Sequence, residues 1–205
     1  MEQAVEKILR EFEERSKREW ELWDKAEASN TPIDVDAFLL SVGPATGQLI
    51  NLLAKEAKSK VILEVGSSYG YSTVWLAEAA RTTGGMVISL EKHPLKQQQA
   101  REAVSKAGLD GAVDFRLGDA RDSLKALRES ADFVLLDLWK DLYIPCFDLF
   151  YPKLRPGALI IADNMTFPES SRAHAEAYRQ HVRKFSDISS VLLQVGSGLE
   201  LSRKL

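Results

Sequence analysis

Short apolar runs and amphipathic segments alternate along most of this chain. The run Val61–Val65 has the length and the β-branched residues of a buried strand, and the segment after it has the spacing of a helix. The expected strands are 61–65, 86–91, 112–117, 133–137, 158–163, 191–195 and 199–203, and the expected helices are 71–80, 95–107, 120–128, 141–154 and 170–184. Alternation of this kind predicts an α/β fold with a seven-stranded, mostly parallel sheet and helices on both faces. The last two strands flank Gly196-Ser197-Gly198 and predict a closing antiparallel hairpin.

The residues before the first strand carry a different pattern. Apolar side chains such as Val5, Ile8 and Trp20 recur at mostly helical spacing among many charges, and they predict an amphipathic helix. The elements expected here are a helix over 4–28 that is broken near Ser16, a break at Asn30-Thr31-Pro32, a short helix over 34–40, and a helix from Gly43-Pro44 to about Lys58. At 205 residues, 1–205 is expected to form one domain with a sizeable core.

Composition narrows the classes of function. The formal net charge of −3 gives no general attraction to nucleic acid or to anionic membranes. Cys146 is the one cysteine, so no intrachain disulfide is possible, and a small buried hydrophobe is the better interpretation of it. The N-terminus is charged from Glu2 onward, unlike a signal peptide, and no apolar stretch approaches the ~20 residues of a membrane helix. We therefore expect a cytoplasmic protein without a membrane partner.

Two of the apolar runs end abruptly in oxygen-bearing side chains. Asp137 follows one run, and Asp163 and Asn164 follow the next. Carboxylate and amide oxygens are the ligands that Mg²⁺ or Ca²⁺ prefers, and open α/β sheets bind ligands at the carboxyl ends of their strands. Lys140 lies three residues after the first aspartate. These residues predict a divalent-metal site beside a lysine.

A glycine-containing loop, Gly66 to Gly70, connects the first strand to a helix. Glycines permit close backbone approach, and a helix N-terminus offers unpaired N–H groups. The loop is not G-x-G-x-x-G, which disfavours a dinucleotide site, and a simple tight turn remains an alternative. Glu91 ends the next strand, where an acid can accept hydrogen bonds from both hydroxyls of a ribose, or can simply pair with Lys92. Asp119 follows the third strand and either contacts an adenine edge or caps the next helix.

Together these motifs resemble the class I S-adenosylmethionine (SAM) methyltransferases, specifically the metal-dependent catechol O-methyltransferase-like group. The resemblance runs from about Ser41 to Lys204. The motifs that carry it are Val42-Gly43 with Gly47-Gln48, Leu63-Glu64-Val65-Gly66 with Gly70-Tyr71-Ser72, Leu136-Asp137-Leu138-Trp139-Lys140-Asp141, and Ala162-Asp163-Asn164. The implied fold is the Rossmann-like SAM-methyltransferase fold, with 1–40 as an N-terminal helical cap and 41–205 as the core.

The resemblance also implies an activity: transfer of a methyl group from SAM to a hydroxyl of a small vicinal diphenol. Lys140 would be the general base, and Asp137, Asp163 and Asn164 would bind Mg²⁺ or another divalent cation such as Ca²⁺ or Mn²⁺. The implied SAM site consists of Val42, Glu64, Gly66, Ser67, Tyr71, Ser72, Glu91, Lys92, Asp119, Ala120, Asp137 and Trp139. The implied substrate site consists of Phe38, Leu40, Trp139, Lys140, Asn164 and Pro168, although core packing explains Leu40 equally well. We expect a monomer or a homodimer.

Two positions depart from the animal catechol enzymes. Leu138 stands where they have a histidine, and Val191 stands near the place of a glutamate that lies by the second hydroxyl of their substrate. A methyltransferase for hydroxyuridine in tRNA and a caffeoyl-coenzyme A-type O-methyltransferase therefore remain alternatives, as does a SAM-binding protein without catalysis. Against the tRNA alternative, the basic stripe of Arg172, Arg179, Arg183 and Lys184 is modest and is better interpreted as a solvated helix face.

Overall fold

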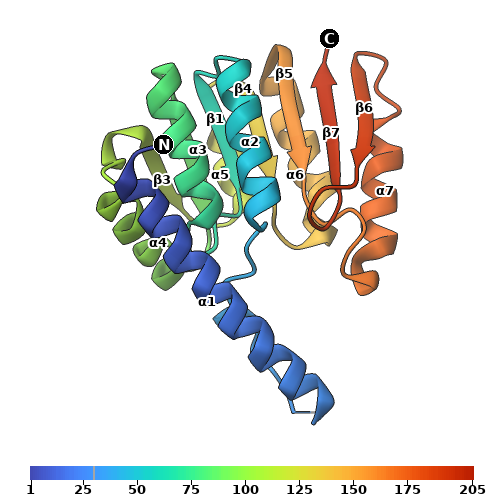
Figure 1. Cartoon of the computed structure of the whole chain (residues 1–205). Helices are drawn as coiled ribbons and strands as arrows, with labels where there is room; N and C mark the ends of the chain where they lie inside the picture. Colours follow the sequence, from blue (N-terminus) through green and yellow to red (C-terminus); the bar gives the residue numbers. More distant parts are fainter. Residues whose placement is uncertain (30) are drawn as a thin grey trace.

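The computed structural model describes residues 1–29 and 31–205, and its centre is one seven-stranded sheet (Figure 1). The strands are β1 (Val61–Val65), β2 (Met86–Glu91), β3 (Val113–Leu117), β4 (Ala131–Leu136), β5 (Leu154–Ala162), β6 (Ile188–Leu193) and β7 (Leu199–Lys204). Their spatial order is β3-β2-β1-β4-β5-β7-β6. The first five strands run parallel, and β7 pairs antiparallel with both β5 and β6. The predicted sheet and its closing hairpin are confirmed.

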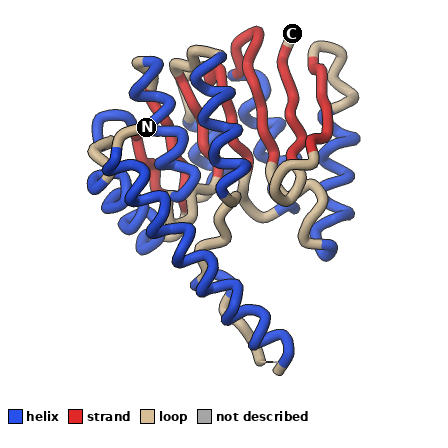
Figure 2. Tube along the Cα trace, viewed as in Figure 1, coloured by secondary structure: helices blue, strands red, loops and turns tan. Residues whose placement is uncertain are grey.

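Helices cover both faces of this sheet, as predicted (Figures 1 and 2). They are α1 (Gln3–Ala28), α2 (Pro44–Glu56), α3 (Tyr71–Thr83), α4 (Pro94–Lys106), α5 (Ala120–Ala126), α6 (Tyr143–Phe150) and α7 (Arg172–Val182). Short 3-10 turns occupy Val35–Ala37, Asp110–Ala112, Lys140–Leu142, Tyr151–Lys153 and Glu169–Ser171. One apolar core holds side chains of α1 to α4, and a second core holds side chains of α5 to α7.

The strand pleat distributes side chains between these two cores. Ile62 belongs to the core under α1 to α4, whereas its neighbour Leu63 belongs to the core under α5 to α7. Phe133 and Val134 of β4 divide in the same way. All four side chains are fully buried, because successive residues of a strand point to opposite faces and both faces are covered. The lone Cys146 is buried in the second core, as predicted.

The N-terminal segment differs from the prediction at two points. Helix α1 is continuous through Ser16, so the predicted break there is wrong. Instead of a helix over 34–40, the chain makes a single 3-10 turn, Val35–Ala37, after which Phe38 is extended and Leu40 has a left-handed φ of 49°. Of the predicted break at Asn30-Thr31-Pro32, Asn30 lies outside the described residues.

Helix α1 has two unlike halves. Its first half packs against the body and buries Val5, Ile8 and Leu9. Its second half extends away from the sheet (Figure 1) and exposes Trp20 and Leu22. Within 1–29 and 31–205, no helix has the length and apolar character needed to cross a membrane.

Candidate active site

The candidate site begins at the carboxyl ends of β4 and β5. These strands are parallel neighbours with Leu136 paired to Ala162, so the next residue of each, Asp137 and Asp163, lies at the same edge of the sheet. Backbone hydrogen bonds continue past the strand ends, because the Asp137 N–H donates to Val65 O at 3.0 Å and the Asp163 N–H donates to Leu136 O at 3.1 Å. The ladder therefore fixes the backbone that carries both carboxylates.

Lys140 turns inward from the 3-10 turn that follows β4. Its side chain is 10% exposed, and its Nζ donates to the Leu138 carbonyl at 3.0 Å and to Asn164 Oδ1 at 2.8 Å. Asp137 Oδ1 lies 3.5 Å away. Lys140 is therefore not a solvated surface lysine. Asn164 has a left-handed φ of 56°, which asparagine tolerates better than most residues.

Burial controls the electrostatics of these groups. It raises the pKa of Asp137 and of Asp163, and in Asp163 the neighbouring Asp137 charge raises the pKa further. Burial also lowers the pKa of Lys140, while Asp137 and Asp163 oppose that change. The group therefore holds two carboxyl groups and a single amine, and of the two carboxyl groups only that of Asp137 contacts the amine.

This arrangement fits a divalent cation. Asp163 Oδ1 is buried and has no hydrogen-bond partner among the residues that the structure describes. A buried carboxylate oxygen without a partner is costly, and a cation would satisfy it. Within 1–29 and 31–205, no group of three or more His, Cys, Asp and Glu side chains could hold a metal ion. A metal ion at this site would therefore also need the Asn164 amide oxygen as a ligand.

Tyr143 was not predicted from the sequence. Its hydroxyl lies 2.7 Å from Lys140 Nζ and donates a hydrogen bond to the Asp163 carbonyl at 3.1 Å. The side chain is fully buried. Its position three residues after Lys140, at the first residue of α6, was the available signal, since residues three apart share one side of a helical turn.

The glycines of the loop after β1 allow this loop to pack closely against neighbouring segments of the chain. Gly66 has a φ of +92°, and a Cβ there would lie 2.1 Å from the Asp137 carbonyl oxygen. Gly70 has a φ of +97°, and its Cβ would lie 2.7 Å from the Ala100 Cβ on α4. The loop thus contacts the segment after β4 on one side and α4 on the other. Ser67 Oγ in this loop is buried and lacks a hydrogen-bond partner among the described residues, so the loop has capacity to bind a polar ligand.

Glu91 lies beside the same loop at the end of β2. Its Oε2 accepts the Ser68 N–H at 2.8 Å, and its Oε1 accepts the N–H groups of Lys92 and His93 at 2.9 Å each. A carboxylate offers about four lone-pair positions, so roughly one remains open. In this arrangement Glu91 has room for one ribose hydroxyl rather than two, and its contact with Lys92 is to the backbone.

Glu64 and Ser72 are hydrogen-bonded to each other inside the core. The Glu64 carboxylate is fully buried and accepts hydrogen bonds of 2.7 Å from the hydroxyls of Ser72, Thr73 and Ser89. Burial raises the pKa of Glu64 to about 7, and the three hydroxyls oppose that rise. A positively charged ligand group beside Glu64 would favour its ionised form.

The other residues expected in the SAM site differ in their surroundings. Val42 is buried in the core under α1 to α4. The Tyr71 hydroxyl donates to Glu13 of α1 at 3.0 Å. Asp119 accepts the Arg121 N–H at 2.8 Å and caps α5, and Ala120 begins that helix. Hydrogen bonds from Arg121 lower the pKa of Asp119 to about 2, so the capping alternative describes its contacts.

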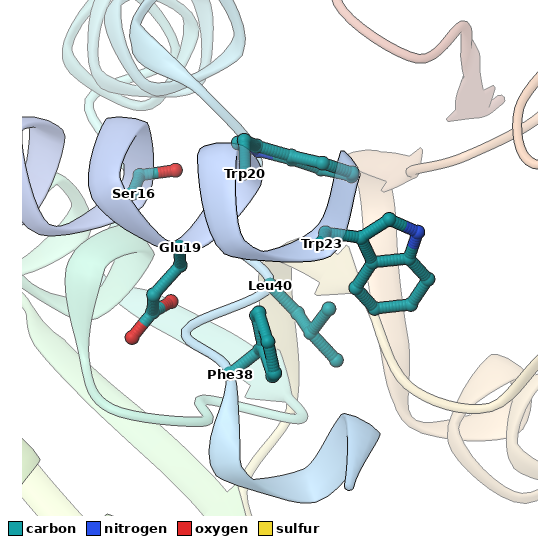
Figure 3. Close-up of a pocket in the computed structure, with 6 residues that line it drawn as sticks. All are labelled: Ser16, Glu19, Trp20, Trp23, Phe38 and Leu40. Carbon is teal, nitrogen blue, oxygen red and sulfur yellow. The ribbon is translucent and has the colours of Figure 1, made fainter. Parts of the chain in front are cut away.

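The expected substrate residues fall into two groups. Phe38 and Leu40 line a small pocket together with Trp20, Trp23, Ser16 and Glu19 of α1 (Figure 3). The Phe38 ring packs edge-on against Trp23, with ring centroids 5.5 Å apart. Trp139 is half exposed next to Lys140, and Pro168 precedes a 3-10 turn after β5. The tryptophans of α1 were not predicted as pocket residues, because their meeting with Phe38 depends on how α1 packs.

The basic stripe of α7 is largely neutralised by acids. Arg179 and Arg183 donate to the fully buried carboxylate of Glu200 on β7 at 3.1 and 2.9 Å. Arg172 pairs with Glu169. The interpretation of this stripe as a purely solvated face is wrong for Arg179, whose side chain is 19% exposed.

Comparison with known proteins agrees with this fold. Residues 25–205 match the model of a family described as O-methyltransferase. The catechol O-methyltransferase of Niastella koreensis is 36% identical over 142 residues, which cover 67% of this chain and 64% of that protein. The catechol O-methyltransferase of Mycobacterium tuberculosis is 30% identical over 154 residues, covering 72% of this chain and 70% of that one.

A solved structure extends the likeness to the whole chain. The O-methyltransferase from Bacillus cereus in complex with SAH is 25% identical, has a TM-score of 0.78, and covers 100% of this chain and 92% of its own. The chain belongs to the O-methyltransferase family and is catechol O-methyltransferase-like, with the Rossmann-like fold of SAM-dependent O-methyltransferases.

Proposed function

We propose that this chain transfers the methyl group of SAM to one hydroxyl of a vicinal diphenol, and that it uses a divalent cation to do so. The observation that carries the proposal is the convergence at the ends of β4 and β5. There the Lys140 amine lies 2.8 Å from Asn164 Oδ1 and 3.5 Å from Asp137 Oδ1, beside an Asp163 oxygen that has no partner among the described residues.

The methyl donor would lie along the glycine loop, next to this centre. Glu91 retains about one acceptor position for a ribose hydroxyl, and Ser67 offers a buried hydroxyl. Glu64 is a buried carboxylate suited to a cationic group, such as the ammonium of the methionine part. When bound, SAM supplies an electrophilic methyl group, so the chain mainly has to position the acceptor oxygen and exclude water.

The acceptor needs to lose a proton before it attacks. The Lys140 amine accepts that proton when it is in its neutral form, which its burial favours. A divalent cation held by Asp137, Asp163 and Asn164 would lower the pKa of the substrate hydroxyl. Three protein oxygens leave coordination positions for two neighbouring substrate oxygens, which is why we propose a vicinal diphenol.

A methyl-transfer assay with isotopically labelled SAM tests the proposal. Caffeate and protocatechualdehyde serve as catechols, guaiacol as the monophenol, and a caffeoyl-coenzyme A ester and tRNA as the alternative acceptors. We expect labelled catechols in Mg²⁺, no transfer in EDTA, recovery on adding Mg²⁺, and little transfer to guaiacol. Full activity in EDTA, or preferred labelling of tRNA, would contradict the proposal.

A variant separates the proposed metal site from the SAM site. Asp163→Ala should lose turnover while keeping the SAM affinity measured by calorimetry, because Asp163 is not among the proposed SAM contacts. Asp122→Ala removes an exposed carboxylate from α5 and is the matched control. Because apolar Val191 stands near the place of an acid in the animal catechol enzymes, we expect both meta and para products. A single regioisomer would mean that the pocket walls select the hydroxyl.

A further inference from the structure

Tyr143 links the two loops that carry the proposed catalytic groups. Its hydroxyl lies 2.7 Å from Lys140 Nζ on the β4 side and donates to the Asp163 carbonyl at 3.1 Å on the β5 side. Lys140 Nζ also lies 4.5 Å from the centroid of the Tyr143 ring. The ring packs edge-on against Tyr178 at 5.4 Å and is fully buried, so packing fixes its position.

The direction of the hydrogen bonds makes the Tyr143 oxygen an acceptor for Lys140. A tyrosine hydroxyl has one proton, and here that proton is donated to the Asp163 carbonyl. The oxygen can therefore receive an N–H from Lys140, but it has no proton left to donate to the lone pair of a neutral amine. A lysine that accepts a proton needs that lone pair free.

The contacts of Lys140 show which protein groups can hold its nitrogen in place. Lys140 Nζ makes three short contacts, with Leu138 O at 3.0 Å, Tyr143 OH at 2.7 Å and Asn164 Oδ1 at 2.8 Å. Asn164 Oδ1 is also a proposed metal ligand, so it is not a permanent partner of Lys140. Leu138 O and Tyr143 OH are the two close acceptors that are not proposed metal ligands, and Tyr143 gives the shorter contact.

We propose that Tyr143 is a positioning residue, whose hydroxyl fixes the Lys140 amine so that its lone pair points to the acceptor hydroxyl. This inference rests on the proposed function, in which Lys140 removes the substrate proton. Tyr143 is placed too deep in the core to bind the substrate, and it acts through Lys140.

Tyr178 provides a matched control. It is as deeply buried as Tyr143 and belongs to the same aromatic cluster. Its hydroxyl has no hydrogen-bond partner in the part of the chain that the structure describes. Tyr143→Phe and Tyr178→Phe each remove one buried oxygen from neighbouring rings, but only the first removes a contact with Lys140.

The first measurement is steady-state kinetics of both variants in Mg²⁺. We expect Tyr143→Phe to lower kcat roughly 10-fold to 100-fold, the usual effect of losing a group that orients a functional residue, with the KM for SAM unchanged. Tyr178→Phe should keep the wild-type kcat. Melting temperatures identify any loss that comes from stability. Equal kcat values in the two variants would overturn the proposal.

The second measurement does not depend on activity. The metal-free and SAM-free proteins are treated with an amine-acetylating reagent, and modification of each lysine is followed by peptide mass spectrometry. Loss of the Tyr143 hydroxyl should release Lys140 and raise its modification rate several-fold, with no such rise in Tyr178→Phe. Lys153, which donates to the carbonyl oxygens of Leu124, Lys125 and Leu127, is the internal reference.

The two measurements distinguish failure of the inference from failure of the proposed function. If the wild type methylates no acceptor in the panel, the proposed function fails, and the modification rates still decide whether Tyr143 fixes Lys140. If Lys140→Ala abolishes turnover but Tyr143→Phe changes neither kcat nor the rate at Lys140, only the inference on Tyr143 fails.

Discussion

At the ends of β4 and β5 the candidate catalytic side chains are largely buried and Lys140 has several hydrogen-bond partners, whereas along the second half of α1 large apolar side chains remain open to solvent. The Lys140 side chain is 10% exposed and lies near four acceptor oxygens. Trp20 is 45% exposed and lines a small pocket with Trp23 (Figure 3). One region fixes atoms relative to one another, and the other offers an apolar surface.

This difference indicates a division of roles. Proton removal needs a defined position for one nitrogen, which burial and hydrogen bonding provide. Contact with the remainder of a substrate needs mainly apolar area, which can tolerate adjustment. Substitutions at the strand ends should therefore change kcat, and substitutions in the pocket of α1 and Phe38 should change KM. The experiments below test this division.

The largest effect is expected at Lys140. Lys140→Ala should lower kcat by roughly 10²-fold to 10⁴-fold, the usual contribution of a general base, with SAM affinity retained. Lys140→Arg should not restore activity, because a guanidinium group stays protonated at any workable pH. Steady-state kinetics and calorimetry measure these effects. Wild-type turnover in Lys140→Ala would remove this residue from the proposed mechanism.

A smaller effect is expected at Gly66, measured as the free energy of unfolding in urea. Gly66→Ala combines a strained left-handed backbone, about 1–2 kcal/mol, with overpacking against the Asp137 carbonyl, about 1–3 kcal/mol. Gly108 is the matched control, since its φ is +70° but a Cβ there meets nothing within 4 Å. Gly108→Ala should show the backbone cost alone, and equal losses would mean that the contact with Asp137 is relaxed in solution.

The smallest effect is expected in the pocket of α1. Trp23→Ala removes the ring that packs against Phe38 and should raise the KM for a catechol roughly threefold to tenfold, equivalent to about 1 kcal/mol, with little change in kcat. Leu22→Ala is the control, because Leu22 is exposed on the same helix and does not line the pocket. An unchanged KM in Trp23→Ala would exclude this pocket from the substrate site.

The sequence predicts the residues at the ends of β4 and β5 better than it predicts the pocket of α1 and Phe38. The first depend on local sequence next to each strand, whereas the second depends on contacts between segments that are distant in the sequence. Asp137 and Asp163 each directly follow a recognisable apolar strand, and parallel pairing then brings them together. The meeting of Trp23 with Phe38 depends on how α1 packs and on the left-handed turn at Leu40, and neither has a local signature. The capping role of Asp119 was only one of two alternatives, since many helix starts carry such an aspartate.

Hydrogen-bond direction also lies beyond what residue spacing predicts. Spacing places Glu91 beside the glycine loop, but the three backbone N–H groups that occupy it follow from the folded loop. The same holds for Tyr143. Its spacing from Lys140 is visible in the sequence, but the donation of its proton to the Asp163 carbonyl depends on where β5 ends.

The contact between Gly66 and Asp137 has a consequence for how acceptor preference can diverge among related proteins. Since main chain meets main chain there, the separation between the loop proposed for the methyl donor and the residue proposed to bind the acceptor does not depend on any side-chain rotamer. Mutations that reshape the α1 pocket leave that separation unaltered. On the proposed function, substitutions in the N-terminal segment would change which acceptor fits without changing the distance between the methyl donor and the acceptor site.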